Sequence, residues 1–132
     1  MELLSFLQEA SRMYDFSLDA AILVGYSNGA NIAAAMLLLE ETRFGGAILH
    51  HPMLPIKPNP ETSKKSIPVL ITTSHNDTIV PYASAKELVR ALTGRGHEVN
   101  VHEYSHGHQL TQAEVENAKN WLRLKKPTTN HL

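Results

Sequence analysis

Hydrophobic residues along this 132-residue chain fall into two alternating kinds of segment. Short and almost unbroken apolar runs occupy residues 20–24, 46–49 and 67–73, a pattern typical of parallel strands that are covered on both faces. Residues 98–104 alternate valine with polar neighbours and predict a fourth strand. Between the second and third runs, prolines recur so often over residues 50–66 that this stretch is expected to be a loop.

The segments before, between and after the predicted strands show helical periodicity. Residues 2–14 form an amphipathic pattern, and residues 28–40 are apolar nearly all round, which predicts a buried helix. A third helix, closed by Gly94 as its C-cap, buries four residues at helical spacing, namely Ala85, Leu88, Val89 and Leu92. The last helix opens at a capping box over residues 111–114, precedes a frayed tail at 127–132, and turns inward Val115, Ala118, Trp121 and Leu122.

Strands that alternate with helices predict an α/β fold, in which about four mostly parallel strands are joined by right-handed crossovers and flanked by helices. The chain shows neither internal repeats nor a second-domain boundary, so we expect a single domain over residues 1–132. In such sheets, chemistry gathers in the loops that follow the carboxyl ends of the strands. The residues after the four predicted strands are therefore the first place to look for a functional site.

Composition narrows the function classes. Hydrophobic residues make up 42% of the chain and charged residues 19%, as in an ordinary soluble globular protein. The formal net charge of -1, without a cluster of Lys or Arg, argues against a nucleic-acid partner. The absence of cysteine excludes disulfides, a thiol nucleophile and a thiolate metal site. No apolar run reaches membrane-spanning length and no signal peptide is visible, so we expect a cytoplasmic protein without a membrane partner.

The strongest motif is Gly25-Tyr26-Ser27-Asn28-Gly29, which joins the first predicted strand to the apolar helix. Strand, G-x-S-x-G and helix in this order indicate a nucleophile elbow, in which a strained turn holds the serine hydroxyl in the open. We expect Cβ atoms at positions 25 and 29 to collide with the turn, and the Asn28 N–H to point at an oxyanion from the helix N-terminus. The alternative interpretation is a common strand-to-helix turn, in which Ser and Gly are frequent.

Two further residues follow strand ends and complete a chemical set with Ser27. Asp77 lies after the third predicted strand and His108 after the fourth. A serine hydroxyl needs a base to take its proton, and an imidazole serves best when a carboxylate fixes its tautomer. Taken singly, Asp77 could be an ordinary turn residue and His108 a surface histidine. His106 competes with His108 as the base; we prefer His108, because Gly107 gives it freedom to turn toward Ser27.

Other residues near these loops are candidates for lining a substrate pocket. We expect this role for Tyr26, His51, Met53, Ile79 and Leu110, although each apolar residue could equally belong to ordinary core. The histidines also raise the question of a metal. Because the chain has no H-E-x-x-H motif and no i, i+4 histidine pair on a predicted helix, we expect neither a metal nor another cofactor.

Four motifs together resemble the phospholipase/carboxylesterase branch of the α/β-hydrolases, close to its small bacterial carboxylesterase and dienelactone-hydrolase-like members. They are Gly-Tyr-Ser-Asn-Gly-Ala-Asn-Ile-Ala (25–33), His-His-Pro-Met (50–53), Asn-Asp-Thr-Ile-Val-Pro (76–81) and Gly-His-Gln-Leu-Thr (107–111). The resemblance implies a serine hydrolase that cleaves small carboxylic esters through an acyl-enzyme. Carried over, Ser27 is the nucleophile, Asp77 the acid, His108 the base, and Asn28 N–H one oxyanion donor.

The chain also departs from that family. Members carry further strands and a helix before the region corresponding to residue 1, including the loop that supplies a second oxyanion donor, whose loss costs on the order of 10²–10³ in turnover. We therefore expect either an N-terminally truncated chain or a homodimer that completes the sheet edge at residues 20–24. The alternative function is a catalytically impaired remnant that acts as a dimerising or binding module.

Overall fold

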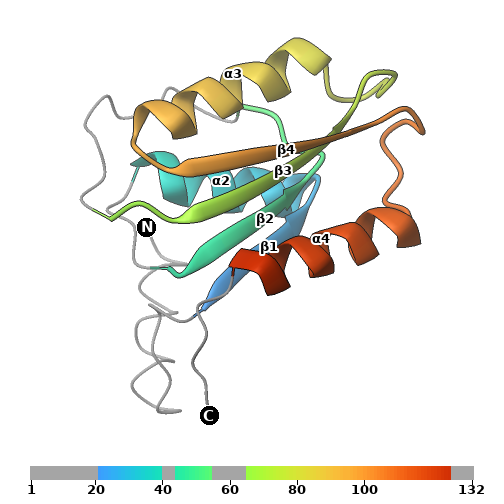
Figure 1. Cartoon of the computed structure of the whole chain (residues 1–132). Helices are drawn as coiled ribbons and strands as arrows, with labels where there is room; N and C mark the ends of the chain where they lie inside the picture. The colour runs from blue at the N-terminus through green and yellow to red at the C-terminus, as the bar shows by residue number, and fades with distance from the viewer. Residues whose placement is uncertain (1–20, 40–43, 55–64, 126–132) are drawn as a thin grey trace.

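The computed structural model describes residues 21–39, 44–54 and 65–125, which form one parallel sheet with helices on both faces (Figure 1). The strands are β1 (Ile22–Tyr26), β2 (Gly46–His50), β3 (Pro68–Ser74) and β4 (Glu98–Tyr104). The helices are α2 (Asn28–Leu39), α3 (Tyr82–Gly94) and α4 (Gln112–Lys125). The α/β prediction is confirmed, with strand bounds within two residues of those expected. The helix expected at 2–14 and the tail at 127–132 lie outside the described residues.

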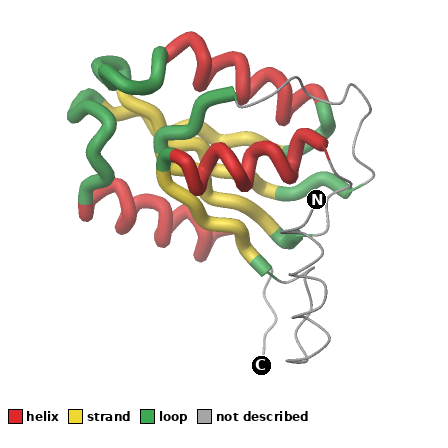
Figure 2. The backbone as a smooth tube through the Cα atoms, turned by 180° about the vertical axis from the view of Figure 1, so that it is seen from behind, coloured by secondary structure: helices red, strands yellow, loops and turns green. Residues whose placement is uncertain are grey.

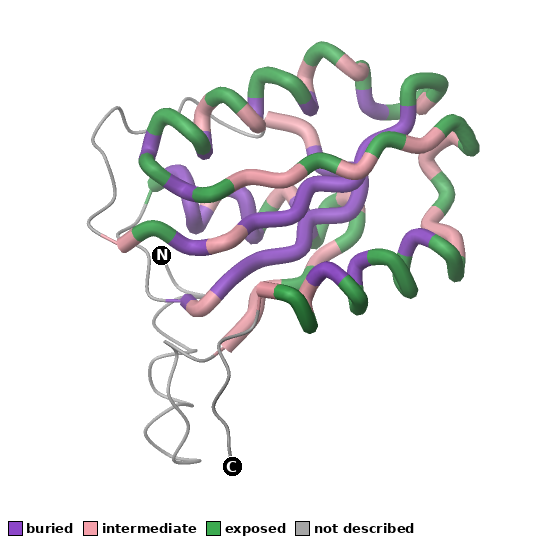
Figure 3. Tube along the Cα trace, in the orientation of Figure 1, coloured by how far each residue is buried: buried purple, intermediate pink, exposed green. Residues whose placement is uncertain are grey.

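The strands pair in chain order, β1-β2-β3-β4, and every pairing is parallel. Helices α2 and α3 cover one face of the sheet and α4 covers the other, as the view from behind shows (Figure 2). β2 is buried along its whole length and β3 nearly so, whereas β1 and β4 are the edges of the described sheet (Figure 3). Unbroken apolar runs suit such central strands, because a parallel strand covered on both faces has no solvent side.

Two apolar clusters hold these layers together. The first lies between the sheet and the helices α2 and α3, and includes Leu37, Leu38, Leu88 and Leu92. The second lies under α4, where Ala118 and Trp121 pack on Ile48 and Leu70, with Ile22 and Leu122 partly buried beside them. The Trp121 Nε1–H donates a hydrogen bond to Asn100 Oδ1 at 2.8 Å, so the indole is satisfied at the rim of the cluster.

Two local predictions were wrong. Gly94 belongs to α3; the C-cap is Arg95, which is right-handed, and the left-handed residue that turns the chain is Gly96, with φ of 99°. Val115 is 42% exposed, not inward, because the buried face of α4 is formed by Glu114, Ala118 and Trp121. The inward face of α4 therefore begins with a carboxylate. None of the described helices is long and apolar enough to cross a membrane.

Candidate active site

Ser27 occupies the turn between β1 and α2, and its backbone is left-handed, with φ of 56°. This conformation is costly for a residue with a side chain, and such strain persists only where the surroundings hold it. The Ser27 N–H donates to the His50 carbonyl at 2.9 Å, and the Ser27 carbonyl accepts from the Asn31 N–H at 3.0 Å. The turn is thus pinned on one side by β2 and on the other by α2.

The two glycines of the motif differ in what they allow. A Cβ on Gly25 would lie 2.5 Å from the Gly29 carbonyl carbon and 2.6 Å from the Ala30 nitrogen, so the first glycine is a steric necessity. A Cβ on Gly29 would meet nothing within 4 Å, so the expectation of a collision there was wrong. The turn closes tightly over Gly25, while Gly29 already stands on the open side of α2.

The structure brings together Ser27, His108 and Asp77, although they are far apart in the sequence. Ser27 Oγ lies 2.9 Å from His108 Nε2, and His108 Nδ1 lies 2.7 Å from Asp77 Oδ2. A carboxylate can only accept, so the His108 proton sits on Nδ1 and the Ser27 hydroxyl donates to the bare Nε2. His106, the competing candidate, lies instead against Glu114, with 3.3 Å between Nε2 and Oε1.

Backbone donors fix the carboxylate of this set. Asp77 Oδ1 accepts hydrogen bonds from the N–H groups of Ile79 at 2.8 Å and Val80 at 2.9 Å, which leaves Oδ2 for His108. Burial alone would raise the Asp77 pKa, but the Val80 N–H, the His108 ring and the Ile79 N–H outweigh it and lower the pKa below its usual value. Asp77 is therefore ionised at neutral pH, as an orienting partner for an imidazole must be.

The loop that carries His108 is also held at several points. Gly107 is left-handed, with φ of 81°, and its N–H lies 3.0 Å from Ser74 Oγ and 2.9 Å from Asn76 Oδ1. The Tyr26 hydroxyl donates to the His108 carbonyl at 3.0 Å, and the two rings lie 5.5 Å apart. Tyr26 thus contacts His108 directly, whereas it was expected only to line a pocket.

The remaining pocket candidates take different places. Met53 is half-buried and anchored through its N–H to Asn31 Oδ1 at 2.9 Å, Leu110 is half-buried, and Ile79 is 67% exposed. His51 is buried between Tyr26 and the histidines of the β4–α4 loop. Two hollows of about 330 and about 620 Å³ flank the edge strand β4, and neither is lined by any of these residues or by Ser27.

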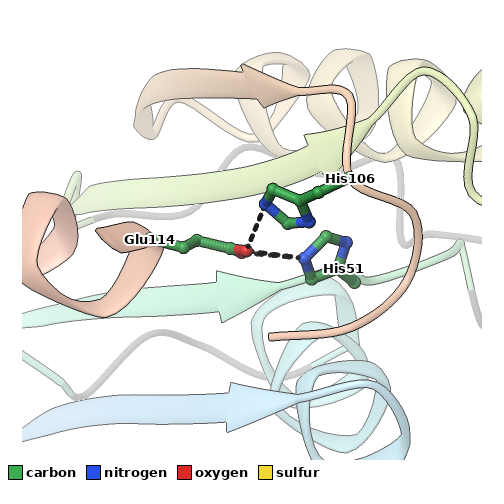
Figure 4. Close-up of side chains that lie close together, drawn as sticks. All are labelled: His51, His106 and Glu114. Atoms are coloured by element: carbon green, nitrogen blue, oxygen red, sulfur yellow. Dashed lines mark hydrogen bonds and ion pairs between the residues drawn. The ribbon is translucent and has the colours of Figure 1, made fainter. Parts of the chain in front are cut away.

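Sequence reasoning missed Glu114, the fully buried carboxylate of α4. Three groups lie within hydrogen-bond distance of its carboxylate: His51 Nε2 at 2.9 Å, His50 Nδ1 at 3.1 Å, and the Thr72 hydroxyl, which donates to Oε2. His106 Nε2 lies 3.3 Å from Oε1, and Figure 4 shows both His51 and His106 directed at this carboxylate. Half of the expected capping box is present, since the Glu114 N–H donates to Thr111 Oγ1 at 3.2 Å. The spacing of Glu114, Ala118 and Trp121 at i, i+4 and i+7 is the signal that places Glu114 on the buried face.

Glu114 is a negative charge inside the protein. Burial would raise its pKa, but hydrogen bonds from His50, His51 and Thr72 together with the nearby His51 ring lower it far below the ordinary value of 4.5. A buried carboxylate needs such a set of donors, because an unpaired one would cost several kcal/mol. These three hydrogen-bond donors, together with the nearby His51 ring, therefore keep Glu114 ionised.

His51 lies between the two carboxylates. Its backbone is left-handed, with φ of 53°, and its Nε2 faces Glu114 while Nδ1 lies 3.6 Å from Asp77 Oδ2. Nδ1 is buried and makes no hydrogen bond in the part of the chain that the structure describes. Two overlapping groups have ligand atoms within 4.8 Å of one another and the right chemistry for a metal: His51, His106 and Glu114, and His51, Asp77 and His108.

Comparison with known proteins matches this chain to one family. The model of the dienelactone hydrolase family matches residues 5–129. Among curated proteins, the chain is 40% identical over 122 residues to "Putative hydrolase MhqD" of Bacillus subtilis (strain 168), covering 92% of this chain and 61% of that protein.

Solved structures agree. The carboxylesterase of Bacillus cereus superposes with a TM-score of 0.88 at 40% identity, covering 94% of this chain and 58% of its own. The structure of YahD with malic acid gives a TM-score of 0.88 at 33% identity, covering 94% of this chain and 60% of its own. The chain thus spans about three fifths of the length of these relatives. Because the family model extends over nearly all of its residues, the chain belongs to the dienelactone hydrolase family.

Proposed function

We propose that this chain is a serine hydrolase that cleaves small carboxylic esters with Ser27 as nucleophile, His108 as base and Asp77 as orienting acid. The observation that carries the proposal is the hydrogen-bonded series from Ser27 Oγ to His108, at 2.9 Å, and on to Asp77, at 2.7 Å. These separations are within the range that nucleophile and base need for proton transfer. Family membership and relatives named hydrolase and carboxylesterase support the same activity.

The proposed reaction has two halves. Ser27 Oγ attacks the ester carbonyl while its proton passes to His108 Nε2, and the imidazolium that forms is stabilised by ionised Asp77. The tetrahedral oxyanion faces the Asn28 N–H, one of the first N–H groups of α2 and without an acceptor inside the helix. His108 then returns the proton to the leaving alcohol, and the acyl-enzyme remains on Ser27. Water, activated by His108 in the same way, releases the carboxylic acid.

Several exposed or half-buried residues with apolar or aromatic side chains lie at or after the strand ends that carry the proposed triad. Tyr26 and Ile79 are exposed, and Met53 and Leu110 are half-buried, so apolar side chains lie near the strand ends that carry the triad. We infer that these residues contact the acyl or alcohol group of the substrate. The alcohol and acyl chain lengths that turn over fastest are measured with a series of p-nitrophenyl esters.

The first test is hydrolysis of p-nitrophenyl acetate by the full chain. Wild type is expected to turn over, and Ser27→Ala to lose that turnover, since no other group is proposed to carry the acyl chain. His75→Ala is the control, because His75 is an exposed loop histidine outside the site. Unchanged hydrolysis in Ser27→Ala contradicts the proposal. A fluorophosphonate that labels Ser27 in a chain without turnover favours the alternative, a catalytically impaired remnant.

We propose a second role, association of two copies through β1. β1 is an edge of the described sheet, Val24 in it is 64% exposed, and Ile32 on the neighbouring helix is 51% exposed. An apolar unpaired edge favours pairing with another chain. Light scattering after size exclusion is expected to give twice the 14.6 kDa chain mass, and Val24→Lys to halve it. Leu124→Lys, at an 85% exposed site on α4, is the matched control. A monomeric wild type contradicts this role.

A further inference from the structure

We propose that His51, His106 and Glu114 form a binding site for a zinc ion, separate from the Ser27 nucleophile. The three side chains come from different segments and converge at one point (Figure 4). His51 follows β2, His106 lies in the loop between β4 and α4, and Glu114 is in the first turn of α4. No sequence motif predicts this set, because its members are brought together only by the packing of α4 on the sheet.

The separations between the donor atoms suit zinc. Tetrahedral zinc with bonds of about 2.0–2.1 Å places neighbouring ligand atoms about 3.3 Å apart. Glu114 Oε1 lies 2.9 Å from His51 Nε2 and 3.3 Å from His106 Nε2, and all three ligand atoms are within 4.8 Å of one another. Two imidazoles and one carboxylate are the donor set of zinc sites that keep a fourth position for water. Imidazole donors favour zinc over magnesium or calcium, which prefer oxygen.

The side chains that contact the proposed ligands are also those that a metal site needs. Glu114 Oε2 is held from the far side by the Thr72 hydroxyl and by His50 Nδ1 at 3.1 Å. Metal-bound histidines usually donate their other ring N–H to a carboxylate or carbonyl. His51 Nδ1 faces Asp77 Oδ2 at 3.6 Å, so zinc on Nε2 would put the ring proton on the atom that faces this carboxylate.

Hydrogen bonding alone does not explain the surroundings of His51 Nδ1. If the neutral His51 ring donates from Nε2 to Glu114, its Nδ1 lone pair points at an ionised carboxylate and has no donor. Zinc on Nε2 resolves the conflict, since the proton then moves to Nδ1. His106 is the member of the set in contact with solvent, since its side chain is 29% exposed while those of His51 and Glu114 are 0% exposed.

Direct binding tests the proposal independently of any hydrolase activity. The full chain, freed of metal by a chelator that is then removed, is titrated with zinc chloride in a calorimeter and melted with and without the ion. One zinc per chain and a higher melting temperature are expected, because a ligand that binds the folded state stabilises it. His106→Ala should weaken binding by more than the roughly 10–100-fold that losing an outer partner costs. His75→Ala, another exposed histidine near a carboxylate, should bind as wild type does.

Two outcomes overturn the assignment. Either wild type takes up no zinc, or His106→Ala binds it with unchanged affinity. If binding survives in His106→Ala and disappears in His108→Ala, the ion belongs to the triad group and the proposed site is wrong. Glu114→Gln serves as a second variant, since the amide keeps the shape of the side chain but is a poor zinc ligand; circular dichroism verifies that each variant is folded.

Discussion

Removing the Glu114 carboxylate is expected to destabilise the protein strongly, although this residue is outside the proposed triad. In Glu114→Ala the donors of His50, His51 and Thr72 stay buried and lose their shared acceptor. A hydrogen bond to a charged group contributes about 1.5–3 kcal/mol, and removing one partner of a buried charged pair costs about 3–5 kcal/mol. Three lost hydrogen bonds of this size would amount to about 4.5–9 kcal/mol, but Glu114 itself no longer has to be desolvated, so we expect the lower range, about 3–5 kcal/mol.

The assay is equilibrium unfolding in urea with Glu116→Ala as the matched control, since Glu116 is an exposed glutamate on the same helix. The control should stay within about 0.5 kcal/mol of wild type, as surface substitutions usually do. Glu114→Gln keeps the shape and one acceptor and should lose less, about 1–3 kcal/mol. If Glu114→Ala unfolds at the same urea concentration as Glu116→Ala, the reasoning about this buried charge is refuted.

The same charge predicts a pH dependence. The Glu114 pKa in the folded protein is below the ordinary value of 4.5, so the folded state favours the ionised form. Its contribution is therefore complete above pH 4.5 and shrinks as the pH falls below that value toward the lowered pKa. The difference in unfolding free energy between wild type and Glu114→Gln should narrow in this acid range. A difference that grows as the pH falls contradicts the sign.

Three further changes test separate parts of the account. Gly25→Ala should prevent folding or destabilise severely, because its Cβ meets backbone at 2.5 Å; Gly29→Ala has open space and should be neutral or about 0.5–1 kcal/mol stabilising, so equal melting temperatures contradict the account of the turn. Asp77→Asn should lower kcat by about 10⁴-fold with a folded chain, as loss of the orienting carboxylate does in a serine triad, and a kcat within tenfold of wild type contradicts its role. Trp121→Phe should cost about 1–2 kcal/mol by freeing Asn100, and no change in urea midpoint argues against that bond.

Much of the fold could be predicted because its signals are local. The apolar runs that form β2 and β3 are buried on both faces. An unbroken apolar run therefore predicts a central parallel strand without having to specify which face of the strand is exposed. The loops after the strands then had to meet at one edge of the sheet, since parallel strands share their direction. That is why the G-x-S-x-G motif and the positions of Asp77 and His108 after strand ends could together name Ser27, Asp77 and His108 as a set.

The features that the sequence did not predict depend on contacts between segments that are distant in the chain. Glu114 fits the local pattern of a capping box, and only the docking of α4 on the sheet shows that its carboxylate faces His50 and His51. Val115 also has helical spacing with Ala118 and Leu122, and only the docking of α4 shows that the buried face is centred on Glu114, Ala118 and Trp121 instead. Because charged residues are mostly exposed, a buried glutamate is predicted to be on the surface unless its hydrogen-bond partners are known.

The most direct test of the central claim is to trap the acyl group. The full chain is mixed briefly with p-nitrophenyl acetate, quenched in acid and analysed by peptide mass spectrometry. The account predicts an acetyl adduct on the peptide that contains Ser27, formed in wild type and absent in His108→Ala, whose serine lacks a base. Hydrolysis without any adduct on Ser27, or an adduct that forms equally well in His108→Ala, would contradict the role of Ser27 and His108.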